Sequence, residues 1–254
     1  MQLTLEIDPR ADALLRIDAR LRARFALHVI TTRHDPVGQL VKGIIGGRTR
    51  SEVAGAALHH LKEGLGSWER LCDTPIGEIE RYISAVTFSE AKAPYVRASL
   101  RQIKRERGRI DLSFLACWSV RDGMAWLERL PGVGRKASAS VLNASVLQRR
   151  ALVLDTHHLR ALRRLGLIGP GCDTVRAYDT IMPLLPSEWS AEDIDDHHRR
   201  YKRLGQTYCR HDTPLCESCP LSGLCPTGRA AQKRRVARFG VPSRRIPERV
   251  RHTV

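Results

Sequence analysis

The sequence predicts an all-α protein. Apolar residues recur at the three- and four-residue spacing of helices through most of the 254 residues. The strict alternation of apolar and polar residues that marks strands is almost absent. Glycine, proline and capping residues divide the periodic segments into about nine or ten helices.

The helices of the first half follow from caps and apolar faces. Residues 37–45 are almost entirely apolar and stop at Gly46-Gly47. Ser51 is expected to cap the next helix, which places its apolar side chains on one face. Residues 74–86 repeat apolar side chains at helical spacing, and residues 89–107 form a long basic helix that stops at Gly108.

The remaining helices surround or follow a short turn, Pro131-Gly132-Val133-Gly134. Residues 122–130 and 136–146 flank this turn, and three further helices are expected over 156–165, 173–185 and 191–208. Near the start of the last one, the run Asp195-Asp196-His197-His198 looks like a metal motif. Only Asp195 and His198 can share a helix face, so the run is interpreted as a solvated helix start.

The chain is strongly basic, with a net charge of +16 and a pI near 10.3. Such a charge is typical of nucleic-acid binders, although many basic proteins bind nothing in particular. Roughly half of it lies after Pro226, where nine Lys or Arg accompany one Glu. Aromatic residues make up only 5% of the chain, which argues against a stacking platform for single strands.

No segment has the length and apolar character of a membrane span, and the first residues lack the basic start of a signal peptide. The expected compartment is the cytoplasm, where thiols stay reduced. Three scattered cysteines, Cys72, Cys117 and Cys172, are therefore expected to be small buried hydrophobic residues.

The predicted domain division has three parts. Residues 35–147 form a helical bundle that ends in the glycine turn and its helices. Residues 1–34 and 148–228 pair as a second helical lobe that carries a cysteine cluster. Residues 229–254, where apolar periodicity fades and arginine density rises, form a basic C-terminal tail.

The turn Leu130-Pro131-Gly132-Val133-Gly134 predicts a phosphate-binding hairpin. Gly132 and Gly134 allow a sharp turn, so that backbone N–H groups converge at the start of the next helix. An ordinary helix–turn with glycines is about equally compatible with the four residues Pro131 to Gly134 alone.

Lys136 follows this turn directly. A cation at the positive end of a helix dipole, flanked by apolar residues and by Arg135, is expected to have a lowered pKa. A lysine of that kind is a competent amine nucleophile. A solvated surface lysine is the alternative.

Asp155 follows Leu152-Val153-Leu154 and precedes Thr156-His157, so it is predicted to cap a helix. A carboxylate fixed at a helix start stays ionised and can also stabilise positive charge on a reacting sugar. The two roles are compatible.

Four cysteines stand in the spacing C-x6-C-x2-C-x5-C: Cys209, Cys216, Cys219 and Cys225. Four thiolates at short spacing predict one soft metal site. Thiolate chemistry alone leaves zinc and iron–sulfur open, although the spacing is not that of the usual zinc ribbon.

Together these motifs resemble the endonuclease III branch of the helix-hairpin-helix DNA glycosylases over about residues 35–228. The resemblance implies two helical lobes with a DNA-binding cleft between them. It also implies a 4Fe–4S cluster on the four cysteines, a monomer, and double-stranded DNA with a damaged base or abasic site as the partner. A bacterial-type, nucleoid-associated location follows.

The resemblance further implies the site residues. Lys136 would attack the sugar C1′ and form a Schiff base, with Asp155 assisting, and β-elimination would then cleave the strand. Residues expected to contact DNA are Arg48, Gly132, Gly134, Arg135, Arg210 and His211.

The chain departs from the family pattern at two points. Arg48 stands where a glutamine normally fills the gap left by the flipped base, and a plain phosphate contact is its alternative role. The interval from Lys136 to Asp155 is one residue longer than expected. An oxidised pyrimidine is the default substrate. Methylated or mismatched bases, a mainly AP-lyase activity, and a binding protein without turnover remain alternatives.

Overall fold

The computed structural model describes residues 8–239, which contain twelve α-helices, two 3₁₀ turns and no strand. The all-α prediction is confirmed. In chain order the helices are α1 Pro9–Arg24, α2 Pro36–Ile45, α3 Ser51–Leu65, α4 Trp68–Asp73, α5 Ile76–Tyr82, α6 Ser89–Arg107, α7 Val120–Leu127, α8 Arg135–Ala144, α9 Thr156–Arg164, α10 Thr174–Ile181, α11 Ala191–Thr207 and α12 Pro226–Phe239. The 3₁₀ turns are Ser113–Ala116 and Met182–Leu184.

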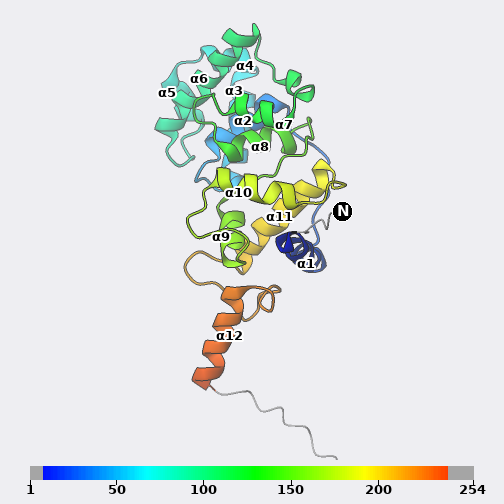
Figure 1. The fold of residues 1–254 in the computed structure, drawn as a ribbon. Coiled ribbons are helices and arrows are strands. Elements are labelled where there is room, and N and C mark those ends of the chain that lie inside the picture. The colour runs from blue at the N-terminus through cyan, green and yellow to red at the C-terminus, as the bar shows by residue number, and fades with distance from the viewer. Residues whose placement is uncertain (1–7, 240–254) are drawn as a thin grey trace, which may run out of the picture.

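The helices gather in two groups (Figure 1). Helices α2 to α8 form the upper group, and α1, α9, α10 and α11 form the lower group, in which α1 lies beside α11. The chain crosses between the groups before α2 and again between α8 and α9. The predicted domains stay a prediction: residues 35–147 form one, and residues 1–34 together with 148–228 form the other.

Close backbone approaches hold the helices of each group in register around the site. In the upper group a Cβ added at Gly43 of α2 would lie 3.2 Å from the Cβ of Ala137 in α8. In the lower group a Cβ at Gly205 of α11 would lie 2.6 Å from the Cβ of His157 in α9. The small residues therefore let α2 and α8, and α9 and α11, pack with little space between them.

Residues 74–86 do not form one helix as predicted. Helix α4 ends at Asp73 and α5 covers only Ile76–Tyr82. The proline at position 75 disfavours helical geometry in Thr74, which is extended, and so separates the two helices. Ser67 starts α4 by accepting a hydrogen bond from the Arg70 amide at 3.2 Å.

Ser51 is not the cap of α3. Arg50 occupies the cap position without a side-chain hydrogen bond, and Ser51 is the first helical residue. Its hydroxyl instead accepts a hydrogen bond of 2.6 Å from Lys202 Nζ in α11. This contact links the two helix groups.

Helix α12 lies partly in the segment predicted as a tail. It projects from the lower group in Figure 1. Pro226 suits a first helical position, and the alanine, arginine, lysine and glutamine residues that follow are good helix formers. Residues 240–254 of the predicted tail lie outside the described residues.

The scattered cysteines differ from one another. Cys72 is buried as expected, whereas Cys117 is exposed and Cys172 is half-buried. The expectation of three buried hydrophobic residues is wrong for the last two, because both lie in loops. None of the helices in residues 8–239 combines the length and apolar character that crossing a membrane requires.

Candidate active site and cysteine loop

The glycine turn joins α7 to α8. Gly132 has a φ of +77°, a conformation that favours glycine. A Cβ there would also lie 2.9 Å from Tyr95 in α6. The backbone conformation and the nearby ring therefore each favour glycine at position 132. Gly134 has ordinary extended geometry.

The start of α8 leaves backbone donors free. In the described part of the chain, the N–H groups of Gly134, Arg135 and Lys136 donate to no protein acceptor. Ser99 Oγ donates to the Pro131 carbonyl at 2.8 Å and fixes the turn against α6. The turn therefore presents N–H groups at the positive end of a helix.

Lys136 occupies the first turn of α8 and is half-buried. Burial lowers the pKa of its ammonium group below the ordinary lysine value, the nearby Asp155 opposes this, and Lys202 and Lys42 lower the pKa further. The structure thus brings Lys136 and Asp155 together. The lowered pKa increases the fraction of neutral, nucleophilic amine at a given pH.

Asp155 caps α9, as predicted. Its Oδ1 accepts a hydrogen bond of 2.9 Å from the His158 amide. Burial raises the pKa of this carboxyl group, but the imidazole of His198, the His158 amide, His157 and Lys202 outweigh burial, so the pKa lies below its ordinary value. Asp155 is therefore a carboxylate that is fixed by its hydrogen bond, favours the ionised form and acts electrostatically on the amine.

A buried cluster of imidazole and phenol rings lies between α9, the helix that Asp155 caps, and α11. His158 of α9 stacks on Tyr201 of α11 with ring centroids 4.1 Å apart, and its Nδ1 lies 3.4 Å from His198 Nδ1. His197 Nδ1 lies 3.0 Å from Asp18 Oδ1 in α1. The prediction of a solvated helix start at residues 195–198 is therefore wrong for both histidines and for Asp195, because α11 turns these side chains into the core of the lower group.

The loop after α2 carries Arg48. Arg48 is exposed and has a φ of +54°. The loop is held by Lys92 of α6, whose buried Nζ donates to the carbonyl oxygens of Ile45 (2.9 Å) and Gly47 and to Thr49 Oγ1 (3.0 Å). A rigid support thus holds an unusual backbone conformation and points Arg48 outward.

Phe88 is a residue that the sequence interpretation missed. It is 50% exposed and has a φ of +59° at the cap position of α6. The neighbouring Thr87 amide donates to Thr49 Oγ1 at 3.2 Å, so the Phe88 turn and the Arg48 loop are joined. The sequence offered one signal, an aromatic residue directly before the predicted helix at residues 89–107.

Arg135 is held within the protein. Its Nε lies 2.9 Å from Glu128 Oε1, its Nη1 lies 3.4 Å from Asp179 Oδ1, and the guanidinium lies over the Tyr178 ring. These contacts favour a structural use of this side chain, which leaves its backbone N–H as the group available to a phosphate.

The four cysteines lie in the loop between α11 and α12, all half-buried. Arg164 of α9 organises this loop. Its Nη1 donates to Cys209 Sγ at 3.3 Å and to the Arg210 carbonyl at 2.5 Å, and its Nη2 donates to the His211 carbonyl at 2.7 Å. Cys225 Sγ in turn donates to the Arg164 carbonyl at 3.1 Å.

The donor chemistry of this loop fits an iron–sulfur cluster. Burial raises the pKa of the Cys216 thiol, and the sulfurs of Cys225 and Cys209 raise it further, so these groups lie near one another. Hydrogen bonds to the ligand sulfurs tune such a cluster, and the Arg164 N–H directed at Cys209 Sγ would be one of them. Within residues 8–239, no three metal-binding side chains converge closely enough to hold a single ion.

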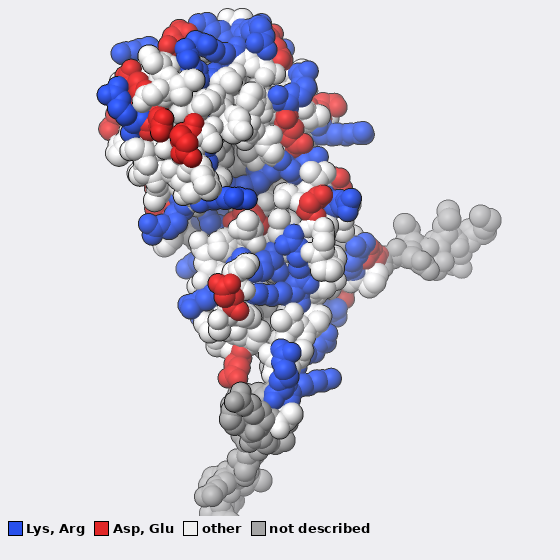
Figure 2. Space-filling model, turned by 90° about the vertical axis from the view of Figure 1, so that its left-hand side faces the viewer, with Lys and Arg blue, Asp and Glu red and all other residues white. Residues whose placement is uncertain are grey.

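Arg210 and His211 are both exposed in the cysteine loop. His211 Nδ1 lies 2.7 Å from Asp212 Oδ1. Figure 2 shows Lys and Arg side chains gathered across the waist between the two helix groups and over the lower group. The described charges therefore provide a basic surface around the predicted site.

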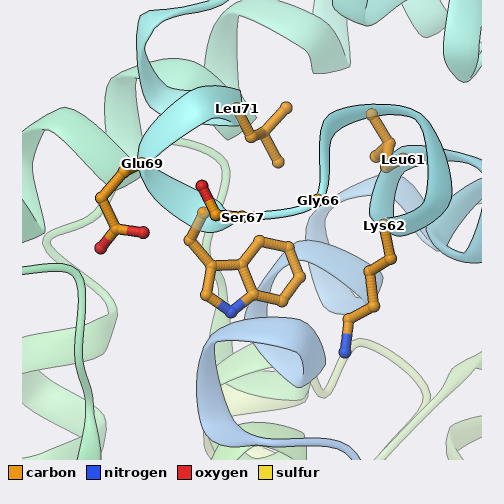
Figure 3. Close-up of a pocket in the computed structure, with 7 residues that line it drawn as sticks. Leu61, Lys62, Gly66, Ser67, Glu69 and Leu71 are labelled. Atoms are coloured by element: carbon orange, nitrogen blue, oxygen red, sulfur yellow. The ribbon is translucent and has the colours of Figure 1, made fainter.

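A separate pocket of about 340 Å³ lies at the turn between α3 and α4 (Figure 3). Lys62 borders it, with its Nζ 5.0 Å from the Trp68 ring centroid and 3.1 Å from Asp35 Oδ2. None of the predicted site residues lines this pocket.

Comparisons with known proteins point to one class. No family model matches the sequence. Endonuclease III of Bacillus subtilis is 28% identical over 161 residues, which cover 63% of this chain and 67% of that enzyme. Endonuclease III of Synechocystis is 32% identical over 155 residues, covering 61% of this chain and 64% of that enzyme. The chain thus matches about two thirds of the length of these curated relatives.

Solved structures extend the likeness to almost the whole fold. A non-covalent endonuclease III–DNA complex has a TM-score of 0.73 at 20% identity and covers 88% of this chain and 98% of the other. A thermostable thymine-DNA glycosylase has a TM-score of 0.68 at 18% identity, and the match covers 88% of this chain and 100% of the other. At these identities the structures establish the fold.

The chain is similar in sequence to endonuclease III and shares the fold of that enzyme and of a thymine-DNA glycosylase. The likeness to endonuclease III that the sequence motifs indicated is confirmed. The relatives likewise support the expected enzyme class, a DNA glycosylase with lyase activity.

Proposed function

We propose that this protein is a base-excision-repair DNA glycosylase with an associated AP lyase activity. The observation that carries the proposal is that the carboxylate of Asp155, which caps α9, acts electrostatically on the desolvated amine of Lys136 at the start of α8. The free N–H groups of the hairpin lie beside that amine. An amine nucleophile, an anion and a phosphate site in one place are the parts that this chemistry requires.

In the proposed reaction the hairpin N–H groups bind a DNA phosphate without reading sequence. The neutral amine of Lys136 attacks C1′ of a flipped nucleotide. Asp155 stabilises the positive charge that develops on the sugar as the base departs. The imine on Lys136 then allows β-elimination of the 3′ phosphate.

Arg48 and Phe88 are proposed to occupy the duplex at the flipped base. Both are exposed, both are held at positive φ, and the Thr49–Thr87 hydrogen bond joins their loops. Apolar side chains can enter a base step as wedges, and an arginine can donate to the base left without a partner. The lesion remains a proposal, with an oxidised pyrimidine as the default and methylated or mismatched bases as alternatives.

The cysteine loop is proposed to hold a 4Fe–4S cluster through Cys209, Cys216, Cys219 and Cys225. When bound, such a cluster would act as a structural cross-link of this loop. Arg164 connects the same loop to α9, the helix that Asp155 caps. Arg210 and His211, which project from the loop, are proposed contacts to the DNA backbone.

Replacing Lys136 tests the reaction. Lys136→Gln should abolish the adduct that borohydride traps on a duplex with an abasic site, because the imine requires the amine. Duplex affinity should change little, since it depends on phosphate contacts elsewhere. Lys104→Gln, an exposed lysine of α6, is the control and should trap normally. A normal yield of adduct from Lys136→Gln would remove this residue from the mechanism.

The second candidate is a DNA-binding protein without turnover. The basic surface alone would support it, but a pure binder has no need of a desolvated lysine beside a carboxylate. Absence of any trapped adduct from the wild-type protein, together with tight binding to abasic duplexes, would favour this candidate.

The purified protein should be brown, with broad visible absorption that bleaches on reduction or loss of the cluster. Cys216→Ser should give colourless or poorly soluble protein, because one of four ligands is removed. Cys117→Ser, which changes an exposed cysteine elsewhere, should keep the colour. A colourless wild type that binds one zinc would contradict the proposed cluster.

A further inference from the structure

Two aromatic side chains of the α6 region are exposed. Phe88 at the cap position is 50% exposed, and Tyr95, two helical turns later, is 46% exposed. Among the side chains that the structure describes, no other Phe, Tyr or Trp is exposed. Phe88 has a proposed place in the duplex. Burial in the core does not explain an aromatic residue at position 95.

One face of α6 contacts both loops that are proposed to bind DNA. Lys92 donates hydrogen bonds to the backbone of the loop that carries Arg48. Ser99 Oγ donates to the Pro131 carbonyl of the glycine hairpin at 2.8 Å. Tyr95 follows Lys92 by three residues and precedes Ser99 by four, so the three side chains share this face. Tyr95 therefore lies between the Arg48 loop and the hairpin.

The Tyr95 side chain lies against the hairpin. A Cβ added at Gly132 would be 2.9 Å from Cβ and Cγ of Tyr95 and 3.0 Å from its Cδ2. The next residues of the turn present backbone donors. In residues 8–239 the N–H groups of Gly134, Arg135 and Lys136 have no protein acceptor. The phenol ring thus borders the part of the hairpin that is suited to an anion.

The Tyr95 hydroxyl group has no hydrogen-bond partner in the described part of the protein. The hydroxyl of Tyr208, by contrast, accepts a hydrogen bond of 3.1 Å from Arg24 Nε. A phenol O–H can donate one hydrogen bond. The Tyr95 hydroxyl is therefore available to an acceptor that arrives from outside, and the proposed function brings phosphate oxygens of DNA to this hairpin.

We propose that Tyr95 binds the DNA backbone: its hydroxyl donates to a phosphate oxygen of the damaged strand, between the flipped nucleotide and the hairpin. The proposal rests on the function proposed above, in which the hairpin holds that strand. Seven residues of helix separate Tyr95 from Phe88, which corresponds to about 10 Å along the axis. Tyrosine is among the residues that contact DNA phosphates, and such a contact positions the strand without reading its sequence.

A phosphate contact suits Tyr95 better than insertion between bases. Its Cβ, Cγ and Cδ2 all lie against Gly132, whereas Phe88 stands at a turn with positive φ before the helix. Side chains that enter a base step as wedges are typically apolar. An inserted ring would therefore tolerate loss of the hydroxyl group, whereas a phosphate contact would not.

The test replaces Tyr95 with phenylalanine, which keeps the ring and removes the hydroxyl group. Fluorescence anisotropy measures binding to a duplex with a tetrahydrofuran abasic-site analogue, which cannot form an imine. Tyr95→Phe should bind about 3-fold to 10-fold more weakly, as expected for one lost hydrogen bond. The slope of log affinity against log salt should not change, because a neutral donor releases no counterion. Tyr82→Phe, whose ring packs over Gly64 of α3, is the matched control and should bind like the wild type.

A methylphosphonate scan of the duplex locates the contact, because each substitution neutralises a single phosphate. The wild type should lose affinity at several positions of the damaged strand. Tyr95→Phe should no longer respond at one position between the flipped nucleotide and the hairpin, and should respond like the wild type elsewhere. Its Tm should equal that of the wild type, because the hydroxyl group has no partner within the described protein.

Wild-type affinity of Tyr95→Phe, or an unchanged methylphosphonate profile, would overturn the proposal and leave the ring with a packing or wedge role. A loss of affinity that comes with a lower Tm, or that is equal at every position, would mean a structural role and would overturn it as well. A wild type that shows the expected binding pattern but traps no adduct would refute the glycosylase proposal alone.

Discussion

A carboxylate at the start of a helix can be both a cap and a reacting group. At Asp155 a substitution by asparagine can separate these two roles. The Asp155 side chain accepts from the His158 amide and lies beside Lys136. Asparagine keeps the hydrogen bond but removes the negative charge. The consequences for folding and for catalysis should therefore differ.

Asp155→Asn should slow base excision on the order of 100-fold to 1000-fold, with a smaller effect on a preformed abasic site, because the electrostatic stabilisation acts mainly as the glycosidic bond breaks. Single-turnover kinetics on both substrates measure this difference. Asp173 caps α10 with a comparable hydrogen bond to the Arg176 amide at 2.8 Å, so Asp173→Asn is the matched control. Equal rates for Asp155→Asn and the wild type would leave Asp155 as a cap only.

At the scale of elements, the packing of α9 against α11 depends on neutral histidines. Burial, then His197 and His198, hold the pKa of His158 well below 6.5. Burial likewise lowers the pKa of His198 to about 4. Both rings pack in the buried cluster between α9 and α11, and the backbone amide of His158 is the group that holds the Asp155 carboxylate.

This packing should make stability depend on pH. A histidine whose folded pKa is depressed contributes stability above about pH 6.5, where both states are neutral, and loses it as the pH falls and the unfolded chain takes up protons. The free energy of unfolding should fall between pH 7 and pH 5, by up to about 1.4 kcal/mol per pH unit for each such histidine. His158→Phe keeps a ring against Tyr201 and should flatten the curve, while His59→Phe, on the exposed face of α3, should not. Identical pH curves for all three proteins would contradict this account.

At the scale of the whole molecule, α12 projects beyond the two helix groups (Figure 1). Its described charges Arg229, Lys233 and Arg234 are exposed. The segment from Pro226 onward has few large apolar side chains, so it is suited to binding phosphates and not to forming a core of its own.

Deleting residues 229–254 should weaken nonspecific DNA binding and reduce the slope of log affinity against log salt by about 0.9 for every phosphate that the shortened protein no longer neutralises. The single-turnover rate at saturating enzyme should barely change, because Lys136, Asp155 and the four cysteines precede the deletion. Replacing Arg229, Lys233 and Arg234 with glutamine keeps the chain length and should reproduce part of the slope change. Loss of catalysis or of folding on truncation would mean that this segment packs on the body.

The sequence by itself determined the features that depend on local chemistry. Helical periodicity predicts the fold class, the glycines predict the turn with Gly132 at positive φ, and Asp155 is recognisable as a cap. Each of these features is settled within a few residues of chain. The four cysteines belong with them, because their spacing within one loop is itself the signal.

Only the tertiary structure decided which distant residues meet these local features. Lys42 and Lys202, which lie on two other helices, act electrostatically on Lys136, and Arg164 holds a loop that begins more than forty residues later. Asp195 and both histidines of the 195–198 run are buried because of the face that α11 turns inward. Periodicity describes one helix at a time, whereas the charge around Lys136 is set by the packing of several helices, which no single stretch of sequence encodes.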